Sequence, residues 1–213
     1  MDDDAKQQAL LSALVTEHFV LQSARGVATS EAASRSALYL TFLSGALIAL
    51  GFIAQVAERF DTFAAAVLPA IVVLGEFTYV RLLENSIEDV LFQRRINRIR
   101  RWYLGLHPDA AQFFGDVLRD PRSSPVLYRS SLQLLLTAAS MVAAVNSMVV
   151  GTGVALVLRA LDLAEVAAAA AGVLVAVGLF ALHVWYERRR FGQLVSGPAA
   201  AGQGAGQGGR SPR

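Results

Sequence analysis

Four long apolar segments alternate with polar stretches along the chain, and each has the length of a membrane-spanning helix. A helix needs about 20 predominantly apolar residues to cross the roughly 30 Å of hydrocarbon in a bilayer. Three of the segments contain no Asp, Glu, Lys or Arg, whereas the second contains Glu76 and Arg81. This pattern predicts an all-α integral membrane bundle of four transmembrane helices, over residues 37–57, 63–83, 132–158 and 166–186.

The polar stretches give the predicted bundle its organisation. Residues 1–29 are expected to form a cytoplasmic amphipathic helix, because Leu10, Leu14 and Leu21 recur at helical spacing. This helix has two possible placements, on the membrane surface or against the central loop, and Gly26 is expected to separate it from the first span. The remaining units are a first transmembrane hairpin (30–84), a basic helical loop (85–130), a second hairpin (131–187), and a basic and then disordered tail (188–213).

The central loop permits two secondary-structure interpretations. No Gly or Pro occurs in the 29 residues from Glu76 to Leu104, so the second span can continue into the cytoplasm as a helix about 44 Å long over these residues. Alternatively, the sequence Ser86-Ile87-Glu88-Asp89 matches a capping box and starts a separate helix. In both interpretations the helix is expected to end at Gly105, before a short helix over 108–118. An apolar stripe runs along it, through Phe92, Ile96, Ile99 and Tyr103.

Composition places the chain among membrane proteins and removes several functional classes. Of its 213 residues, 54% are hydrophobic and 17% are charged, and the mean hydropathy is +0.46. Soluble domains carry about 25% charged residues, so the composition argues against a soluble globular protein and against a disordered one. The absence of Cys excludes disulfides, Cys-based metal sites and Cys nucleophiles. The three His lie in separate segments without metal-ligand spacing, and no phosphate-binding Gly motif is present, so no enzyme activity, metal or cofactor is predicted.

The distribution of basic residues predicts which segments face the cytoplasm. Of 19 Lys and Arg, 17 lie before the first span, between Arg81 and Arg129, or after the fourth span. The two short connections within the hairpins carry one each, Arg59 and Arg159. Because basic residues are retained on the cytoplasmic side, both termini and the central loop are expected in the cytoplasm of a multi-pass plasma membrane protein. The chain begins with an acidic stretch rather than the basic region of a secretory signal, so the first span is expected to stay as an anchor.

Ionisable and amide side chains inside the predicted spans are the first candidates for function. Glu76 falls in the inner third of the bilayer, about 21 Å from the outer end of the second span. The polar layer expected with it consists of Thr41, Ser44, Thr137 and, nearer the surface, Gln133. Asn146 lies near the middle of the third span, where its amide needs a partner. Glu76 and Asn146 are interpreted either as an ion or proton site or as structural groups paired with polar neighbours, which for Glu76 include Arg81.

Small and aromatic residues predict how the spans pack and where they end. A row of small residues along the third span ends at Gly151 and lets a neighbouring helix approach closely, and Gly45 lies on a similar row in the first span. Such rows serve packing within the chain, and self-association into a homo-oligomer is also expected. Tyr39, His183 and Trp185 are expected at the membrane interface, where amphipathic rings are common.

The basic residues of the central loop are the second set of candidates. They surround the apolar stripe and comprise Arg94, Arg95, Arg98, Arg100 and Arg101, with Tyr103 on the stripe itself. A basic residue beside an anionic leaflet gains about 1 kcal/mol, so membrane lipids are the expected ligand. A cytoplasmic protein partner or another anionic ligand is the alternative. No nucleic-acid-binding motif is present, so a nucleic-acid partner is not expected.

Two functions from different classes remain open. In the first, the chain is a structural or signalling membrane component that acts through its cytoplasmic basic helical region. In the second, it is a small oligomeric channel or transporter-like protein in which Glu76 and Asn146 line a path for ions or protons. The first is favoured, because polar residues are many outside the spans and few inside them.

Overall fold

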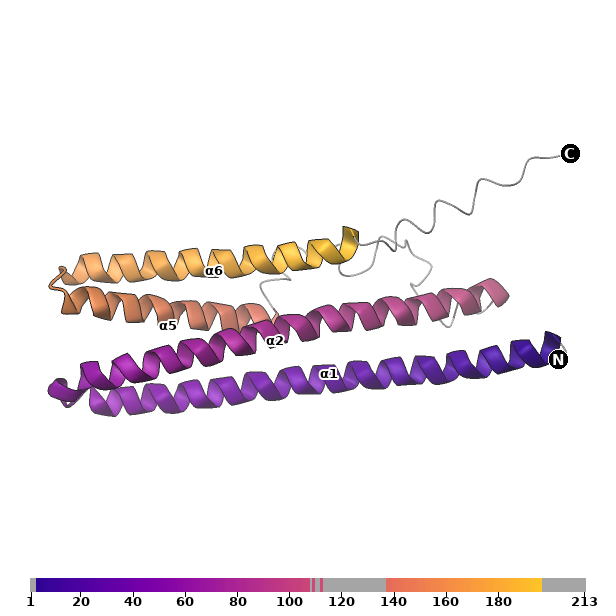
Figure 1. Cartoon of the computed structure of the whole chain (residues 1–213), viewed down its shortest axis with the longest axis horizontal. Coiled ribbons are helices and arrows are strands. Elements are labelled where there is room, and N and C mark those ends of the chain that lie inside the picture. Colours follow the sequence, from indigo (N-terminus) through magenta and orange to yellow (C-terminus); the bar gives the residue numbers. More distant parts are fainter. Residues whose placement is uncertain (1–2, 108, 110–111, 113–136, 197–213) are drawn as a thin grey trace, which may run out of the picture.

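The computed structural model of the chain describes residues 3–107, 109, 112 and 137–196. Within these ranges the regular structure consists of long α-helices, and no strand occurs (Figure 1). The helices are α1 (Asp3–Ile53), α2 (Ala57–Leu106), α5 (Ala138–Ala160) and α6 (Glu165–Ser196). All four are long and apolar enough to cross a membrane. The prediction of an all-helical chain with four such helices is therefore confirmed.

The helices pack mainly in chain order. α1 runs antiparallel beside α2, α5 runs antiparallel beside α6, and α2 packs on α5 (Figure 1). The turns of both pairs lie at the same end, where four helices are side by side. At the opposite end, α1 and α2 extend beyond the end of α6 (Figure 1). We call residues 3–30 of α1 and 84–106 of α2 the stalk; the end of α6 packs beside the first part of its α2 segment, and the rest extends beyond α6.

α1 is one continuous helix, so the expected separation at Gly26 is wrong. A mid-helix Gly costs about 1 kcal/mol relative to Ala. Contacts of the stalk offset this cost, because Leu14 and Leu21 pack against a stripe on α2, formed by Phe92, Ile96, Ile99 and Tyr103. Arg25 adds two hydrogen bonds to the carboxylate of Asp89. Of the two placements considered for the N-terminal helix, the structure contains the one against the central basic segment.

α2 is also continuous, through Pro69 and Ser86, so the second span extends into the stalk without a break. Ser86 does not cap a new helix; its hydroxyl donates to the carbonyl of Leu82, one turn earlier. The helix ends one residue after Gly105, where the N–H of His107 donates to the carbonyl of Tyr103. The short helix expected over 108–118 falls almost wholly outside the described residues.

The second pair of helices differs from the predicted boundaries at both ends. α5 begins at Ala138, because the hydroxyl of Thr137 accepts a hydrogen bond from the N–H of Ser140 and caps the helix. Residues 132–136 of the predicted third span lie outside the described part. α6 continues to Ser196, so the basic residues after the fourth span lie in the same helix as the span. The tail expected from residue 197 onward lies outside the described residues.

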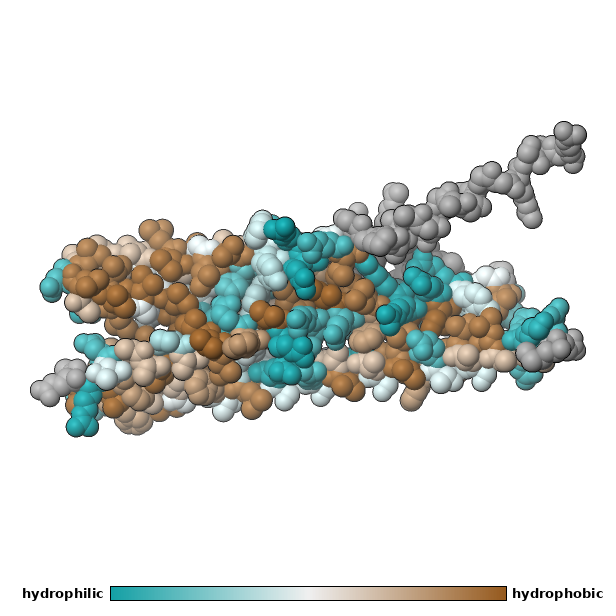
Figure 2. Space-filling model, viewed as in Figure 1, coloured by the Kyte–Doolittle hydropathy of each residue, from teal (hydrophilic) through white to brown (hydrophobic). Residues whose placement is uncertain are grey.

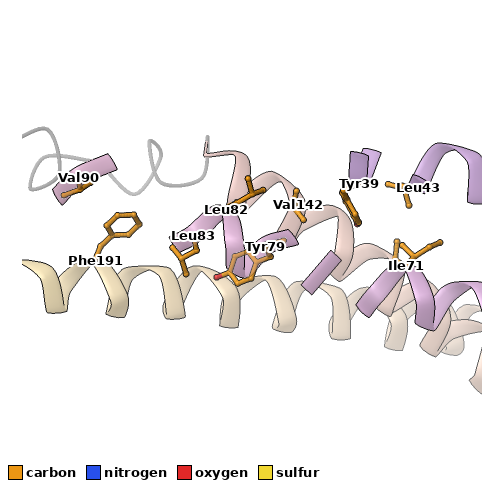
Figure 3. Packing of buried hydrophobic residues seen from close by; sticks show 12 residues of the cluster. Tyr39, Leu43, Ile71, Tyr79, Leu82, Leu83, Val90, Val142 and Phe191 are labelled. Atoms are coloured by element: carbon orange, nitrogen blue, oxygen red, sulfur yellow. The ribbon is translucent and has the colours of Figure 1, made fainter. Parts of the chain in front are cut away.

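The core lies where the four helices meet, and much of the outer surface is apolar. Figure 3 shows core side chains contributed by every helix, among them Tyr39, Ile71, Tyr79, Val142 and Phe191. Tyr39 is 1% exposed, so its ring faces the other helices and not the outer surface. Only 11% of the most apolar window of α1 and 17% of that of α6 is buried. Apolar side chains cover the end that contains the turns (Figure 2), a surface that suits hydrocarbon rather than water.

Candidate functional site

The carboxyl group of Glu76 on α2 meets polar groups from both α5 and α6. Nδ2 of Asn146 donates to Oε1 of Glu76 at 2.8 Å and to the carbonyl of Val72 at 3.2 Å. Nε2 of His183 lies 3.2 Å from each carboxyl oxygen of Glu76. Asn146 is fully buried and the His183 side chain is 8% exposed, whereas 42% of the Glu76 side chain is exposed. Side chains from three helices therefore form one polar cluster, which we call the Glu76 site.

His183 is fixed at three points. Its Nδ1 lies 2.8 Å from the carbonyl of Leu179, one turn earlier on α6. The hydroxyl of Tyr79 donates to the backbone carbonyl of His183 at 3.1 Å. The edge of one of these two rings faces the plane of the other, with centroids 4.6 Å apart. Backbone and ring contacts therefore hold the imidazole with Nε2 directed at the carboxyl group of Glu76.

A second polar group lies one helical turn from His183. Glu187 is 1% exposed, and its Oε2 accepts a hydrogen bond of 2.9 Å from the hydroxyl of Ser140. The Ser140 hydroxyl is also 2.9 Å from that of Thr137, which caps α5. These groups continue the line of polar side chains from the Glu76 site to Thr137, the N-cap of α5.

Ion pairs mark the edge of the apolar surface beside the site. Arg35 lies 2.6 Å from Glu31, and Arg81 lies 3.6 Å from Glu31 and 2.8 Å from Glu84. The hydrogen bond and the positive charge of Arg35 lower the pKa of Glu31, and Arg81 adds to this effect. Glu76 precedes Arg81 by five residues, so its Cα lies about 8 Å inside this charged edge.

Glycines permit the close helix contacts that position the site. A Cβ atom at Gly75 would overlap the carboxamide of Asn146, 2.5 Å from its Cγ. Gly151 and Gly172 bring α5 and α6 together: a Cβ atom at Gly172 would lie 2.5 Å from the carbonyl oxygen of Gly151 and 2.9 Å from Cβ of Ala155. The close approach predicted at Gly151 is therefore confirmed.

The other predicted members of the intramembrane layer do not join the Glu76 site directly. Thr41 is exposed on α1, and exposed Ser44 donates to the carbonyl of Leu40. Thr137 belongs to the neighbouring group around Glu187, and Gln133 lies outside the described residues. Arg81 pairs with Glu31 and Glu84 instead of Glu76.

His183 is the member of the site that the sequence did not identify. Its proximity to Trp185 indicated an interfacial ring, but the imidazole is buried against α2. The spacing of polar residues along α6 could have identified it. His183 and Glu187 are four residues apart and share one face, whereas Trp185 and Tyr186 lie on the exposed side.

The basic residues of the stalk have different environments. Arg95, Arg98 and Arg101 are exposed, whereas Arg94 donates to the carbonyl of Leu194 near the end of α6 at 2.8 Å. Arg100 is half-buried beside Gln22, Arg25 and Gln93 between the two helices, and Tyr103 packs in the stalk core. Burial, and next the charge of Arg100, lower the pKa of His18.

An apolar cleft of about 640 Å³ opens between α2 and α5. It lies toward the end with the turns and is lined mainly by aliphatic side chains, including Leu68, Val72, Val149 and Val157. Neither Glu76 nor Asn146 lines it. In the described part of the chain, no group of three or more His, Cys, Asp or Glu side chains is placed to hold a metal ion.

Comparison of the chain with models of protein families, with curated proteins and with solved structures gave no match. The geometry of the stalk and of the Glu76 site therefore carries the functional proposal.

Proposed function

We propose that the chain is a multi-pass plasma membrane protein that presents its stalk to a cytoplasmic protein partner. In this proposal the four apolar helices cross the membrane as two hairpins, and both termini and the basic segment 85–130 face the cytoplasm. The protein acts as a structural or signalling component, and it self-associates. The supporting observation is that α2 runs without interruption from the apolar span to the end of the stalk.

Distance favours a protein partner over the lipids of the chain's own membrane. Arg95 follows Arg81 by 14 residues and Arg101 follows it by 20, so a straight helix holds them about 21 to 30 Å beyond the charged edge. A headgroup layer is about 5 to 8 Å thick on each side of the hydrocarbon. Screening at physiological salt reduces attraction beyond about 8 Å. A helix at a steep angle to the membrane therefore carries these guanidinium groups past the lipid surface, where they suit an acidic protein surface.

Site-specific photo-crosslinking in cells tests the partner. The full chain carries a photoreactive amino acid at Leu91, on the exposed surface of the stalk, or at Thr62, near the opposite end of α2. We expect an adduct of defined mass at position 91 only, and its loss in the Arg95→Gln, Arg98→Gln, Arg101→Gln triple variant.

Two results would contradict the proposal. One is an adduct at position 91 that is unchanged in the triple variant. The other is the absence of an adduct together with loss of co-purified anionic lipid in that variant, which would show that lipid is the ligand. A matched control changes basic residues at the opposite end, Arg59→Gln with Arg159→Gln, and should leave the adduct unchanged.

Movement of protons or small ions is a second candidate, favoured by the pairing of Glu76 with His183 and Asn146 inside the apolar region. Reconstituted vesicles with a pH-sensitive dye inside measure it directly. Flux that Glu76→Gln abolishes would make this the primary function. We expect no flux, because neither Glu76 nor Asn146 lines the apolar cleft and the carboxyl group is already paired.

A further inference from the structure

The hydrogen-bond partners of His183 determine where its protons lie. Nδ1 is 2.8 Å from the carbonyl oxygen of Leu179, and a carbonyl oxygen only accepts, so Nδ1 carries a hydrogen. The other ring nitrogen, Nε2, is then free to be either protonated or unprotonated. Because Nε2 faces Glu76, the protonation state of that carboxyl group determines whether Nε2 carries a hydrogen.

The contact between His183 and Glu76 requires one proton between them. An unprotonated Nε2 is an acceptor, and an ionised carboxylate is acceptor-only. At 3.2 Å from both carboxyl oxygens, Nε2 and Glu76 form a favourable contact when the proton is on Nε2, as an ion pair, or on the carboxyl group, as a neutral pair. Asn146 contributes a donor to Oε1, and its second N–H faces Val72, so it does not supply this proton.

We propose that Glu76 and His183 together form a binding site for one exchangeable proton, which links α2 to α6. With the proton bound, the pair has no net charge, as suits an apolar environment. Without it, a carboxylate faces the lone pair of Nε2, which places a net negative charge inside the spans and removes the favourable contact between Glu76 and His183. Occupancy of the site therefore controls how firmly α6 is held against α2.

The surrounding groups define the site and its route of exchange. The titratable groups packed around it are Tyr79 on α2, Glu187 on α6 and Tyr39 in the core from α1, whereas α5 contributes the amide of Asn146 and the hydroxyl of Ser140. With 42% of its side chain exposed, Glu76 is not sealed by this chain. The polar groups that follow it, Glu187, Ser140 and Thr137, lead toward the charged edge, where water is available.

Nitrogen NMR of the full chain in lipid nanodiscs, with 15N-labelled histidine, tests the proposal. The chain has three His, and His183→Gln identifies the signal from position 183. We expect Nδ1 of His183 to remain protonated while the Nε2 signal changes between about pH 5 and pH 8, the range in which imidazoles commonly titrate. In Glu76→Gln the change should disappear, because the amide N–H donates permanently to Nε2. In Glu76→Asp it should persist.

Exposed His107, at the end of α2, provides the internal control, since its signal should be the same in all variants. A His183 signal that does not change with pH in the wild type would overturn the proposal and make the pair a fixed structural contact. A titration that is the same in Glu76→Gln as in the wild type would also overturn it. Proton binding is measured here without flux, so the outcome is independent of the stalk partner and of the transport test.

Discussion

The contact between Gly151 and Gly172 gives a sharp test of the packing between α5 and α6. Replacing Gly172 by Ala adds one methyl group at the point of closest approach. That Cβ would lie 2.5 Å from a backbone oxygen of Gly151 and 2.9 Å from Cβ of Ala155. Neither atom belongs to the end of a flexible side chain, so the helices themselves must move apart.

The expected change in the free energy of unfolding for Gly172→Ala is the balance of two opposing effects. Overpacking a close contact costs about 1–3 kcal/mol, and the upper part of this range applies because backbone lies on one side of the new methyl group. Replacing Gly by Ala inside a helix stabilises by about 1 kcal/mol. Gly172→Ala should therefore lower the free energy of unfolding by about 2 kcal/mol. Gly178 on the same helix has open space within 4 Å, so Gly178→Ala should be neutral or stabilising.

The assay is reversible unfolding by dodecyl sulfate in mixed micelles, followed by circular dichroism and pulse proteolysis. Comparing the two alanine variants cancels the propensity term and leaves a difference of about 3 kcal/mol from overpacking. Equal stability of the two variants would show that the helices do not approach through these glycines. That result would refute the packing that aligns Asn146 and His183 with Glu76.

Three further predictions concern the stalk and the site. A double-mutant cycle of Arg25→Gln and Asp89→Asn should give a coupling of about 0.5–1 kcal/mol in the free energy of unfolding, because the pair is partly exposed; additive effects would contradict the pairing. The pKa of His18 is lower in the folded chain than its ordinary value of 6.5. Between these two pKa values the unfolded chain binds more protons than the folded chain, so the free energy of unfolding should fall as the pH drops from 6.5 toward the lowered pKa. Arg100→Gln should raise the pKa of His18 in an NMR titration, and an unchanged pKa would contradict the contribution of the Arg100 charge. Gly75→Ala should destabilise by about 1–3 kcal/mol in the micelle assay, because it displaces the carboxamide that bonds Glu76; wild-type stability would contradict that contact.

The spans could be predicted from the sequence because the signal is local. An uncharged run of about 20 residues indicates a spanning helix whatever its neighbours are. The continuity of α1 could not be predicted this way, since Gly26 is a local signal for a break. The contacts that preserve the helix, such as the packing of Leu21 on Ile96 and the pair of Arg25 with Asp89, join residues far apart in sequence.

The Glu76 site was predictable in part. Glu76 and Asn146 stand out because polar groups in apolar spans need partners. Their partner His183 lies near the end of its span, beside Trp185, where an interfacial role is the ordinary interpretation. The burial of Tyr39 could not be predicted for the same reason, because position along a span suggests depth in the membrane but not which side of the helix faces the core. That choice depends on how the helices pack.

In the proposed topology, the stalk and the two turns lie on opposite sides of the membrane. Because the chain has no Cys, single cysteines can be placed at Thr62 and Ala164 near the turns, at Glu17 on the stalk, and at His107 directly after its last residue. All four positions are exposed. In intact bacterial cells that express each variant, a membrane-impermeant maleimide should label the first two and should label the stalk positions only after the cells are opened. Labelling of position 17 or 107 in intact cells, or equal labelling of all four, would contradict a cytoplasmic stalk carried by four membrane-spanning helices.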